Sequence, residues 1–233
     1  MARLPRLSIA GCPHHVLQRG NNRQAVFMDD ADRSRYMVLL GDAASRFKVA
    51  VHAYVLLDNH VHLLLTPADA EGLAQTMQAL GRAYVRYFND RHGRSGTLWE
   101  GRYRSAPLEG APYLLPCLVW LDTHPQRAGL ASEPAAYGWS SHGHYVGQRM
   151  DRLITPPDAY WALGNTPFAR EAAYAELVRA GLGAPMERAF TRFAQGGWPM
   201  GGAAFAAELA QVGGRRTVRG RAGRPKKPPA AAE

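Results

Sequence analysis

The feature that most limits the possible folds is a pair of apolar segments joined by a short polar turn. Val49–Leu57 is apolar and rich in β-branched residues, Asp58–Asn59 forms a two-residue turn, and His60–Thr66 is apolar again. Segments of this composition on either side of such a turn predict an antiparallel β-hairpin. We therefore expect a β-sheet at the centre of the fold.

Other segments supply strands and helices around this hairpin. Strands are expected at 13–19 and 102–107. Apolar residues at helical spacing predict helices over about 30–47 and 70–91, and Pro112 opens a third helix that Pro125 stops. Mixed order with an antiparallel pair predicts an α+β fold, in which helices cover one antiparallel sheet in the ferredoxin-like, split βαβ arrangement.

The periodic signal weakens after the third helix. Glycines and prolines dominate up to about residue 165, so this part is expected to be rich in loops, and a helical pattern returns over 167–195. From about Gly213 the chain is basic, then rich in proline and alanine, which predicts disorder. We expect a domain over 1–130, an extension over 131–212 and a tail over 213–233.

The charge points to a polyanionic partner. The 233 residues carry a formal net charge of +9, which favours nucleic acid first and an anionic membrane surface second. Much of the excess lies in the tail, whose basic residues are Arg215, Arg216, Arg219, Arg221, Arg224, Lys226 and Lys227. The stretch Gly220–Lys227 also resembles a degenerate AT-hook, which binds a narrow minor groove.

Several classes of protein are excluded. No apolar run approaches the roughly 20 residues that cross a bilayer, and the basic N-terminus lacks the continuous apolar region of a secretory signal. Cys12 and Cys117 are too few for a disulfide framework or a cysteine zinc site, which fits a reducing compartment. We expect a cytoplasmic, nucleoid-associated protein.

The strongest local motif is His60-Val61-His62. Alternation along a strand puts the two imidazoles on one face of the sheet and Val61 on the other. Two adjacent imidazoles form half of a divalent-metal site. The alternative is that both are half-buried histidines hydrogen-bonded to their neighbours or to water.

The surrounding sequence resembles a known family. The run Tyr54–Pro67 is similar to the HUH motif (histidine, hydrophobic, histidine) of single-tyrosine transposases. Further matching segments follow the expected order, at 19–23, 97–103 and 125–130. Together they cover roughly residues 1 to 150, and the combination resembles the REP-associated tyrosine transposases.

This resemblance implies a reaction on DNA. The histidine pair and a third polar ligand would hold magnesium or manganese against a scissile phosphate of single-stranded DNA, and a tyrosine would attack to leave a 5′-phosphotyrosine. The resemblance also implies a homodimer that recognises hairpins formed by short palindromic repeats.

The sequence departs from the family at the nucleophile, because Trp120 stands where the tyrosine is expected. An indole has only an N–H donor and no hydroxyl that can attack. The alternative is a neutral aromatic exchange at a packing position.

Other tyrosines are candidates for a substitute nucleophile. Tyr113 is one candidate, yet it lies two helical turns, roughly 10 Å, from Trp120. Tyr84 and Tyr87 fall on the second helix, and Tyr84 fits its apolar stripe.

His124 replaces the asparagine that is usual in the family, one helical turn after Trp120. One interpretation is a site of three histidines, which suits manganese or zinc better than magnesium. The other is that His124 only caps the C-terminus of the third helix. The sequence leaves both open.

Basic and aromatic residues near the matched motifs are the candidates for DNA contact, because arginine holds phosphates and an aromatic ring stacks on an unpaired base. The candidates are Arg19, Asn21, Asn22, Arg23, Arg102, Tyr103, Arg104, Arg221, Arg224, Lys226 and Lys227. A solvated charged surface is the alternative interpretation.

Three functions are consistent with these residues. The first is a transposase-like protein that binds single-stranded or hairpin DNA and is impaired in phosphotyrosine transfer. The second is an active metal-dependent transposase or endonuclease that uses another tyrosine or a metal-activated water. The third is an RNA-hairpin-binding protein, since the same surface suits RNA.

Overall fold

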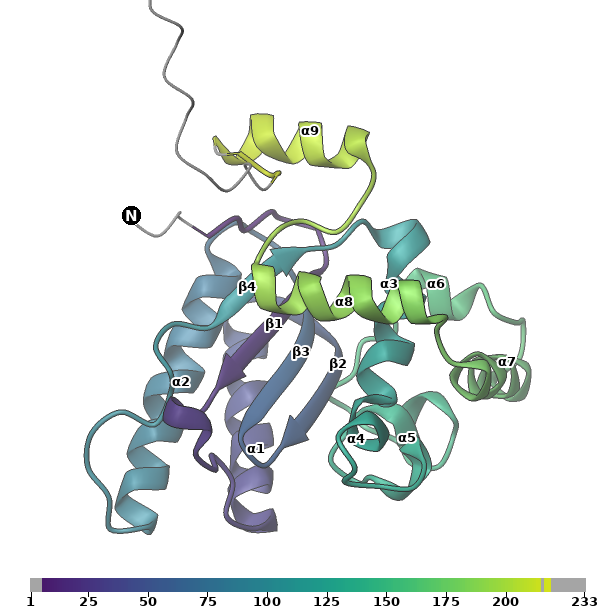
Figure 1. Cartoon of the computed structure of the whole chain (residues 1–233). Coiled ribbons are helices and arrows are strands. Elements are labelled where there is room, and N and C mark those ends of the chain that lie inside the picture. The colour runs from purple at the N-terminus through teal and green to yellow at the C-terminus, as the bar shows by residue number, and fades with distance from the viewer. Residues whose placement is uncertain (1–5, 215, 219–233) are drawn as a thin grey trace, which may run out of the picture.

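A computed structural model describes residues 6–214 and 216–218 of the chain, which form one sheet with helices on both faces (Figure 1). The strands are β1 (His14–Arg19), β2 (Val49–Leu57), β3 (His60–Pro67) and β4 (Arg104–Pro107), in the order β2-β3-β1-β4. All three pairs are antiparallel. The predicted hairpin is β2–β3, and the α+β fold is confirmed.

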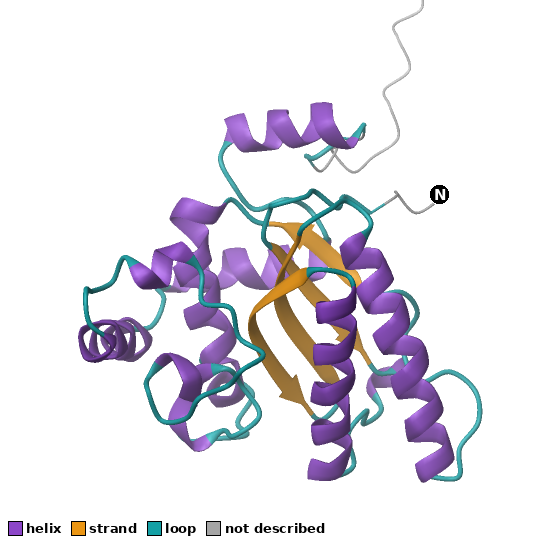
Figure 2. Cartoon of the chain, turned by 180° about the vertical axis from the view of Figure 1, so that it is seen from behind, coloured by secondary structure: helices purple, strands orange, loops and turns teal. Residues whose placement is uncertain are grey.

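Two long helices cover one face of the sheet, α1 (Asp30–Arg46) and α2 (Gly72–Arg91) (Figure 2). Side chains of Phe27, Tyr36 and Tyr84 pack together between them, with ring centroids 5.1 to 5.6 Å apart. Val38, an apolar residue of α1, is 53% exposed, so not every apolar residue of this helix packs against the sheet. No helix within the described ranges is both long and apolar enough to span a bilayer.

A buried carboxylate joins the start of α1 to the end of α2. The Asp29 side chain accepts a hydrogen bond from the backbone N–H of Asp32 and so caps α1. Asp32 is fully buried and accepts from Arg91 at 2.6 Å and from His92 at 2.9 Å. A buried charge is retained only when it is paired in this way, so these contacts fix the two helices at one end.

The third helix differs from its predicted span. It runs as α3 from Gly110 to Asp122, two residues earlier than expected at its start, and includes Pro116. It ends at Thr123, whose hydroxyl donates to the carbonyl of Val119. Pro125 lacks the N–H that would continue the helix, and it lies instead in the first turn of α4 (His124–Arg127), where proline is tolerated.

The C-terminal extension contains more helix than the sequence predicts. Its elements are η2 (Pro134–Ala136), α5 (His142–Tyr145), α6 (Asp158–Trp161), α7 (Pro167–Ala180), α8 (Ala184–Gly196) and α9 (Ala203–Gly213). The single helix expected over 167–195 is divided into α7 and α8, because Gly181 adopts a φ of 65° that ends α7. Phe168, an apolar residue at the start of α7, is 79% exposed.

The chain stays folded a little beyond the predicted start of the tail. The hydroxyl of Thr217 donates to the carbonyl of Ala206 in α9 at 2.7 Å, and Thr217 is buried. Disorder from Gly213 is therefore wrong for residues 216–218. The tail candidates Arg221, Arg224, Lys226 and Lys227 lie outside the described residues.

The extension is attached to α3 through a second buried carboxylate. Asp122 is fully buried, and one of its oxygens accepts from His142 Nδ1 at 3.0 Å and from the Tyr174 hydroxyl at 2.7 Å. His142 belongs to α5 and Tyr174 to α7. The backbone N–H of Ser141 donates to the carbonyl of Tyr54, which adds a link to β2. The end of α3 is thus held from the extension as well as from the sheet.

The bond between Tyr174 and Asp122 predicts how removal of the Tyr174 hydroxyl changes stability. Tyr174→Phe leaves Asp122 short of a hydrogen bond in a buried position, so the free energy of unfolding should fall by about 2 kcal/mol, as for other bonds to charged groups. Urea denaturation measures the change. Tyr113→Phe removes a hydroxyl from half-buried Tyr113 and is the matched control, with little expected effect. Equal stabilities of the two variants would contradict the importance of the Asp122 contacts.

Candidate metal centre

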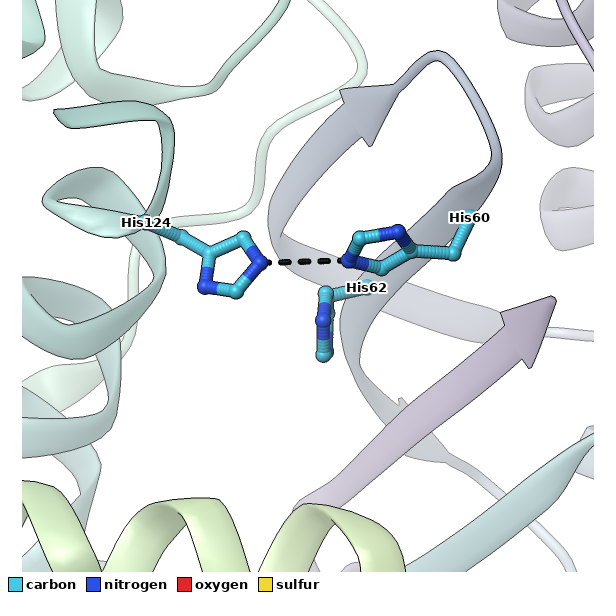
Figure 3. Close-up of side chains that lie close together, drawn as sticks. All are labelled: His60, His62 and His124. Carbon is cyan, nitrogen blue, oxygen red and sulfur yellow. Dashed lines mark hydrogen bonds between the residues drawn. The ribbon is translucent and has the colours of Figure 1, made fainter. Parts of the chain in front are cut away.

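Three imidazoles meet on the face of the sheet opposite to α1 and α2 (Figure 3). His60 and His62 project from β3 on the same face, as alternation requires, and His124 projects from the start of α4. His60 Nε2 lies 3.1 Å from His124 Nε2, and one ring nitrogen from each of the three residues lies within 4.8 Å of the others. The structure therefore brings the three predicted ligands together.

Hydrogen bonds orient two of these rings. His60 Nδ1 lies 2.5 Å from the side-chain oxygen of Asn59, which only accepts, so Nδ1 carries the proton and Nε2 is an acceptor that faces His124 Nε2. His62 Nδ1 lies 2.8 Å from Nε2 of His15. When His62 donates through Nδ1 to His15, its Nε2 carries a free lone pair. Such partners outside the ligand set fix the tautomer of a metal ligand.

His15 was missed by the sequence analysis. It lies on β1, whose pairing with β3 sets Leu17 opposite His62, so that His15 lies one step along the same face. It is 1% exposed, and its ring centroid is 5.0 Å from that of His62. The available signal was the alternation of His15, Leu17 and Arg19, although it becomes informative only once β1 is paired with β3.

Every imidazole of the cluster is neutral at pH 7. Burial lowers the pKa of His60 to about 4 and that of His124 to about 3, and it also holds the pKa of His62 well below its usual value. Burial alone lowers the pKa of His15 to about 3. Neutral imidazole is the form that binds a metal ion, so the cluster does not need to lose protons before it can coordinate one.

The donor set fits a divalent transition metal. Within the described ranges no carboxylate joins the three histidines. Imidazole suits zinc and other transition metals, whereas magnesium prefers carboxylate and water oxygens. The residues therefore match manganese or zinc better than magnesium.

Arg127 determines the tautomer of the third histidine, His124. Its guanidinium lies 3.3 Å from His124 Nδ1 and can only donate, which places the His124 proton on Nε2, directed at His60. Coordination through His124 Nε2 requires the other tautomer and release of this contact. A cap on α3 is not supported, because a neutral imidazole does not supply the positive charge that a helix C-terminus favours and His124 lies beyond Thr123.

Trp120 lies against the cluster. Its ring meets His62 and His15 edge-on at 5.3 and 5.8 Å and stacks on Phe190 of α8 at 5.9 Å. The side chain is 3% exposed, and its indole N–H has no hydrogen-bond partner among the described residues. The position expected for a nucleophile is thus beside the histidines but carries no hydroxyl.

The substitute tyrosines lie elsewhere. Tyr113 does not line the cavity at the histidines. Tyr84 is fully buried and donates to the carbonyl of Val26, so it is a core residue, as its spacing predicts. Tyr87 is on α2, on the other side of the sheet (Figure 1). In the part of the chain that the structure describes, no tyrosine lines this cavity.

The cavity at the cluster has a volume of about 180 Å³. β1 contributes Leu17 and Arg19, and α8 contributes Thr191, Ala194 and Gln195 on the side away from the sheet. Helix α8 crosses this face of the sheet in Figure 1. The histidines therefore lie at the bottom of a small recess between the sheet and α8.

A second recess, of about 160 Å³, adjoins the first and shares Leu17 and Arg19 with it. Arg102 and Arg104 complete its basic lining. Glu100 is its acidic residue, and Oε2 of Glu100 lies 3.9 Å from Nη1 of Arg19. Three of the predicted DNA-contact residues are therefore gathered beside the histidines. Guanidinium groups in such a recess suit phosphate oxygens.

The other candidates for DNA contact are placed differently. Asn21, Asn22 and Arg23 form the short helix η1, in which Asn22 and Arg23 have φ values of 50° and 59°. Tyr103 is only 8% exposed, and the guanidinium of Arg6 lies 3.8 Å from its ring centroid. Tyr103 is thus not the open stacking surface that the sequence predicts, because Arg6 covers one face of the ring.

Comparison with known proteins relates this arrangement to transposases. Residues 8–115 match the family model described as IS200-like transposase. A solved REP-associated tyrosine transposase bound to a REP hairpin aligns with a TM-score of 0.53 at 14% identity, over 68% of this chain and 93% of that one. A putative transposase from Deinococcus radiodurans R1 gives a TM-score of 0.36 at 21% identity, over 48% and 89% of the two chains. Among curated proteins no sequence matches.

The matched segment contains the whole sheet, α1, α2 and both histidines of β3. Trp120 and His124 follow it in the chain, so the match to the family model does not bear on the missing tyrosine or on the third histidine. The structural likeness concerns the fold alone. Residues 8–115 resemble the IS200-like transposases, and the chain has the fold of a REP-associated tyrosine transposase.

Proposed function

We propose that this protein binds single-stranded or hairpin DNA of palindromic repeats at the histidine centre and does not form a phosphotyrosine. The observation that carries the proposal is the packing of Trp120 against His62, in a cavity where the described residues supply no tyrosine. The arginine recess beside it suits the DNA backbone. The solved relative with a REP hairpin supports hairpin DNA as the partner.

The proposed role of the histidines is to hold manganese or zinc, with magnesium less suited to them. A divalent ion held by His60, His62 and His124 would neutralise charge on a bound phosphate. His15 and Asn59 keep His62 and His60 in orientations that direct Nε2 into the cavity. Arg19 and Arg127, which line the same cavity, would add contacts to the phosphate.

Two further features belong to the proposal. The family resemblance favours a homodimer and a location on the nucleoid.

The second candidate function is a metal-dependent endonuclease. It is favoured by a cavity that retains the histidines without the tyrosine, since a water is then the remaining nucleophile. RNA-hairpin binding is the third, and competition between DNA and RNA hairpins of equal sequence distinguishes it.

The metal proposal predicts the effect of removing one ligand. His62→Ala should lower manganese affinity at least tenfold, because the remaining imidazoles cannot complete the site. DNA affinity measured without added metal should fall little, since phosphate contacts supply most of it. Calorimetric titration with Mn²⁺ measures the first effect and fluorescence anisotropy the second. His144→Gln, a histidine outside the cluster, is the matched control. Unchanged manganese affinity of His62→Ala would favour purely structural histidines.

The nucleophile proposal predicts a gain of function. The unmodified protein should form no covalent adduct on a labelled single-stranded hairpin with manganese, whereas Trp120→Tyr should form a detectable one, because the hydroxyl then lies beside His62. Tyrosine is smaller than tryptophan, so the substitution should leave a cavity that costs about 1–2 kcal/mol.

A denaturing gel for protein-linked DNA distinguishes the outcomes. Trp120→Phe, which also shortens the side chain but adds no hydroxyl, is the control and should give no adduct. An adduct on the unmodified protein would contradict the proposal, and its mapping to Tyr113 would identify the substitute nucleophile. Strand cleavage without an adduct would favour the endonuclease.

A further inference from the structure

A larger cavity lies on the other side of β1, between α2 and the β4 edge of the sheet. Its volume is about 400 Å³. Helix α2 supplies Gln75, Gln78 and Arg82 to its lining, β1 supplies Gln18, and Tyr103 comes from the segment before β4. Ala74 and Met77 of α2 add apolar surface, so the cavity combines three side-chain amides with an apolar wall.

Gln18 is the least satisfied group in this cavity. Leu17 and Arg19 face the histidine centre, so strand alternation directs Gln18 to the α2 side. The residue is 6% exposed, and its side-chain oxygen has no hydrogen-bond partner among the described residues. Buried polar atoms are nearly always paired. An unpaired acceptor that lines a cavity indicates a ligand that brings a hydrogen-bond donor.

The walls suit a planar group. Arg6 covers one face of the Tyr103 ring, with its guanidinium carbon 3.8 Å from the ring centroid, and donates to the Tyr103 carbonyl at 3.2 Å. Guanidinium planes and aromatic rings are the surfaces on which unpaired bases stack. Gly81 of α2 has no side chain, and a Cβ added there would lie 3.9 Å from Gln18 Nε2, an ordinary van der Waals distance. The side-chain amide of Gln18 therefore borders the cavity directly beneath Gly81.

The cavity is continuous with basic surface on both sides. It shares Arg102 with the arginine recess, which in turn shares Arg19 with the histidine centre. In the other direction it shares Arg82 with a surface groove that also contains Arg35 and Arg86. All three arginines of that groove are exposed, and no described residue forms a salt bridge with them.

From this geometry we infer that the cavity between α2 and the β4 edge binds one unpaired base of the DNA strand whose backbone passes Arg102 and Arg19 to the histidines. The inference rests on the proposed function. Gln18 accepts a hydrogen bond from the exocyclic amine of adenine or cytosine and donates to the adjacent ring nitrogen, as glutamine does when it reads adenine. Arg82 and Arg102 hold the phosphates on either side of that base.

The test uses the full-length protein and DNA hairpins with a single-stranded arm of about ten nucleotides, a length within the usual range of single-strand binding sites. Each arm position is varied in turn, and affinity is measured by fluorescence anisotropy at fixed salt. One position should prefer adenine or cytosine over thymine by about tenfold, the discrimination typical of a bidentate amide contact. Purine without its amine at that position should bind as weakly as thymine.

Two variants separate reading of the base from holding of the backbone. Gln18→Met keeps the size of the side chain and should abolish the base preference while leaving the affinity for the thymine arm within about threefold. Arg82→Ala should weaken all arms alike and lower the slope of log affinity against log salt by about 0.7, the value for one phosphate of a single strand. Gln148→Met, at an exposed position outside the cavity, is the control and should change neither property.

Several outcomes would overturn the inference. One is the absence of base preference at every arm position of the unmodified protein, a result that does not depend on any variant folding. Another is a preference that persists in Gln18→Met, or a Gln18→Met protein that loses affinity equally for all arms, as a purely structural residue would. Failure of the unmodified protein to bind any DNA hairpin would overturn the proposed function itself. The same base preference and affinity with RNA arms would overturn the assignment to DNA.

Discussion

The antiparallel pairing of β1 with β3 determines where the polar groups of the centre lie. Because Leu17 is opposite His62, the His15 ring reaches Nδ1 of His62 on one face of the sheet, while Gln18 projects to the other face. A shift of one residue in this register would exchange the faces of all these side chains. It would put Gln18 among the histidines and move His15 and Arg19 under α2. The apolar alternation of Val16 and Leu63, which are fully buried, opposes such a shift.

The second constraint is the position of the α3 C-terminus. Trp120 and His124 contribute to the centre only because α3 ends beside β3, and Asp122 between them is held by His142 and Tyr174 of the extension. Helix α8 adds Phe190 and Phe193 against Trp120 and His15. The family-matched segment ends at residue 115, before all these contacts. The extension is therefore part of the centre and not a separate appendage.

The parts of the structure that depend on local pattern were predictable. Alternation in 60–66 was enough to place His60 and His62 on one face, and helical spacing was enough to bring His124 near Trp120. His15 and Gln18 were not predictable, because their surroundings depend on strand partners and a helix far away in the sequence. The same holds for α7, in which Phe168 is exposed while Tyr174 and Val178 are buried, since the face of the helix that packs depends on neighbours far away in the sequence.

No carboxylate of the described residues joins the three histidines, which has a thermodynamic consequence for the proposed metal site. Neutral imidazoles would leave the full charge of a divalent ion uncompensated. Arg19 and Arg127 beside them add to the positive potential, which together with burial lowers the pKa values of His60 and His124. A phosphate of the proposed nucleic acid would supply counter-charge, so that ion and strand would be cooperative ligands, and by linkage each would raise the affinity of the other by the same factor. Metal would then occupy the site more fully in the complex than in the free protein.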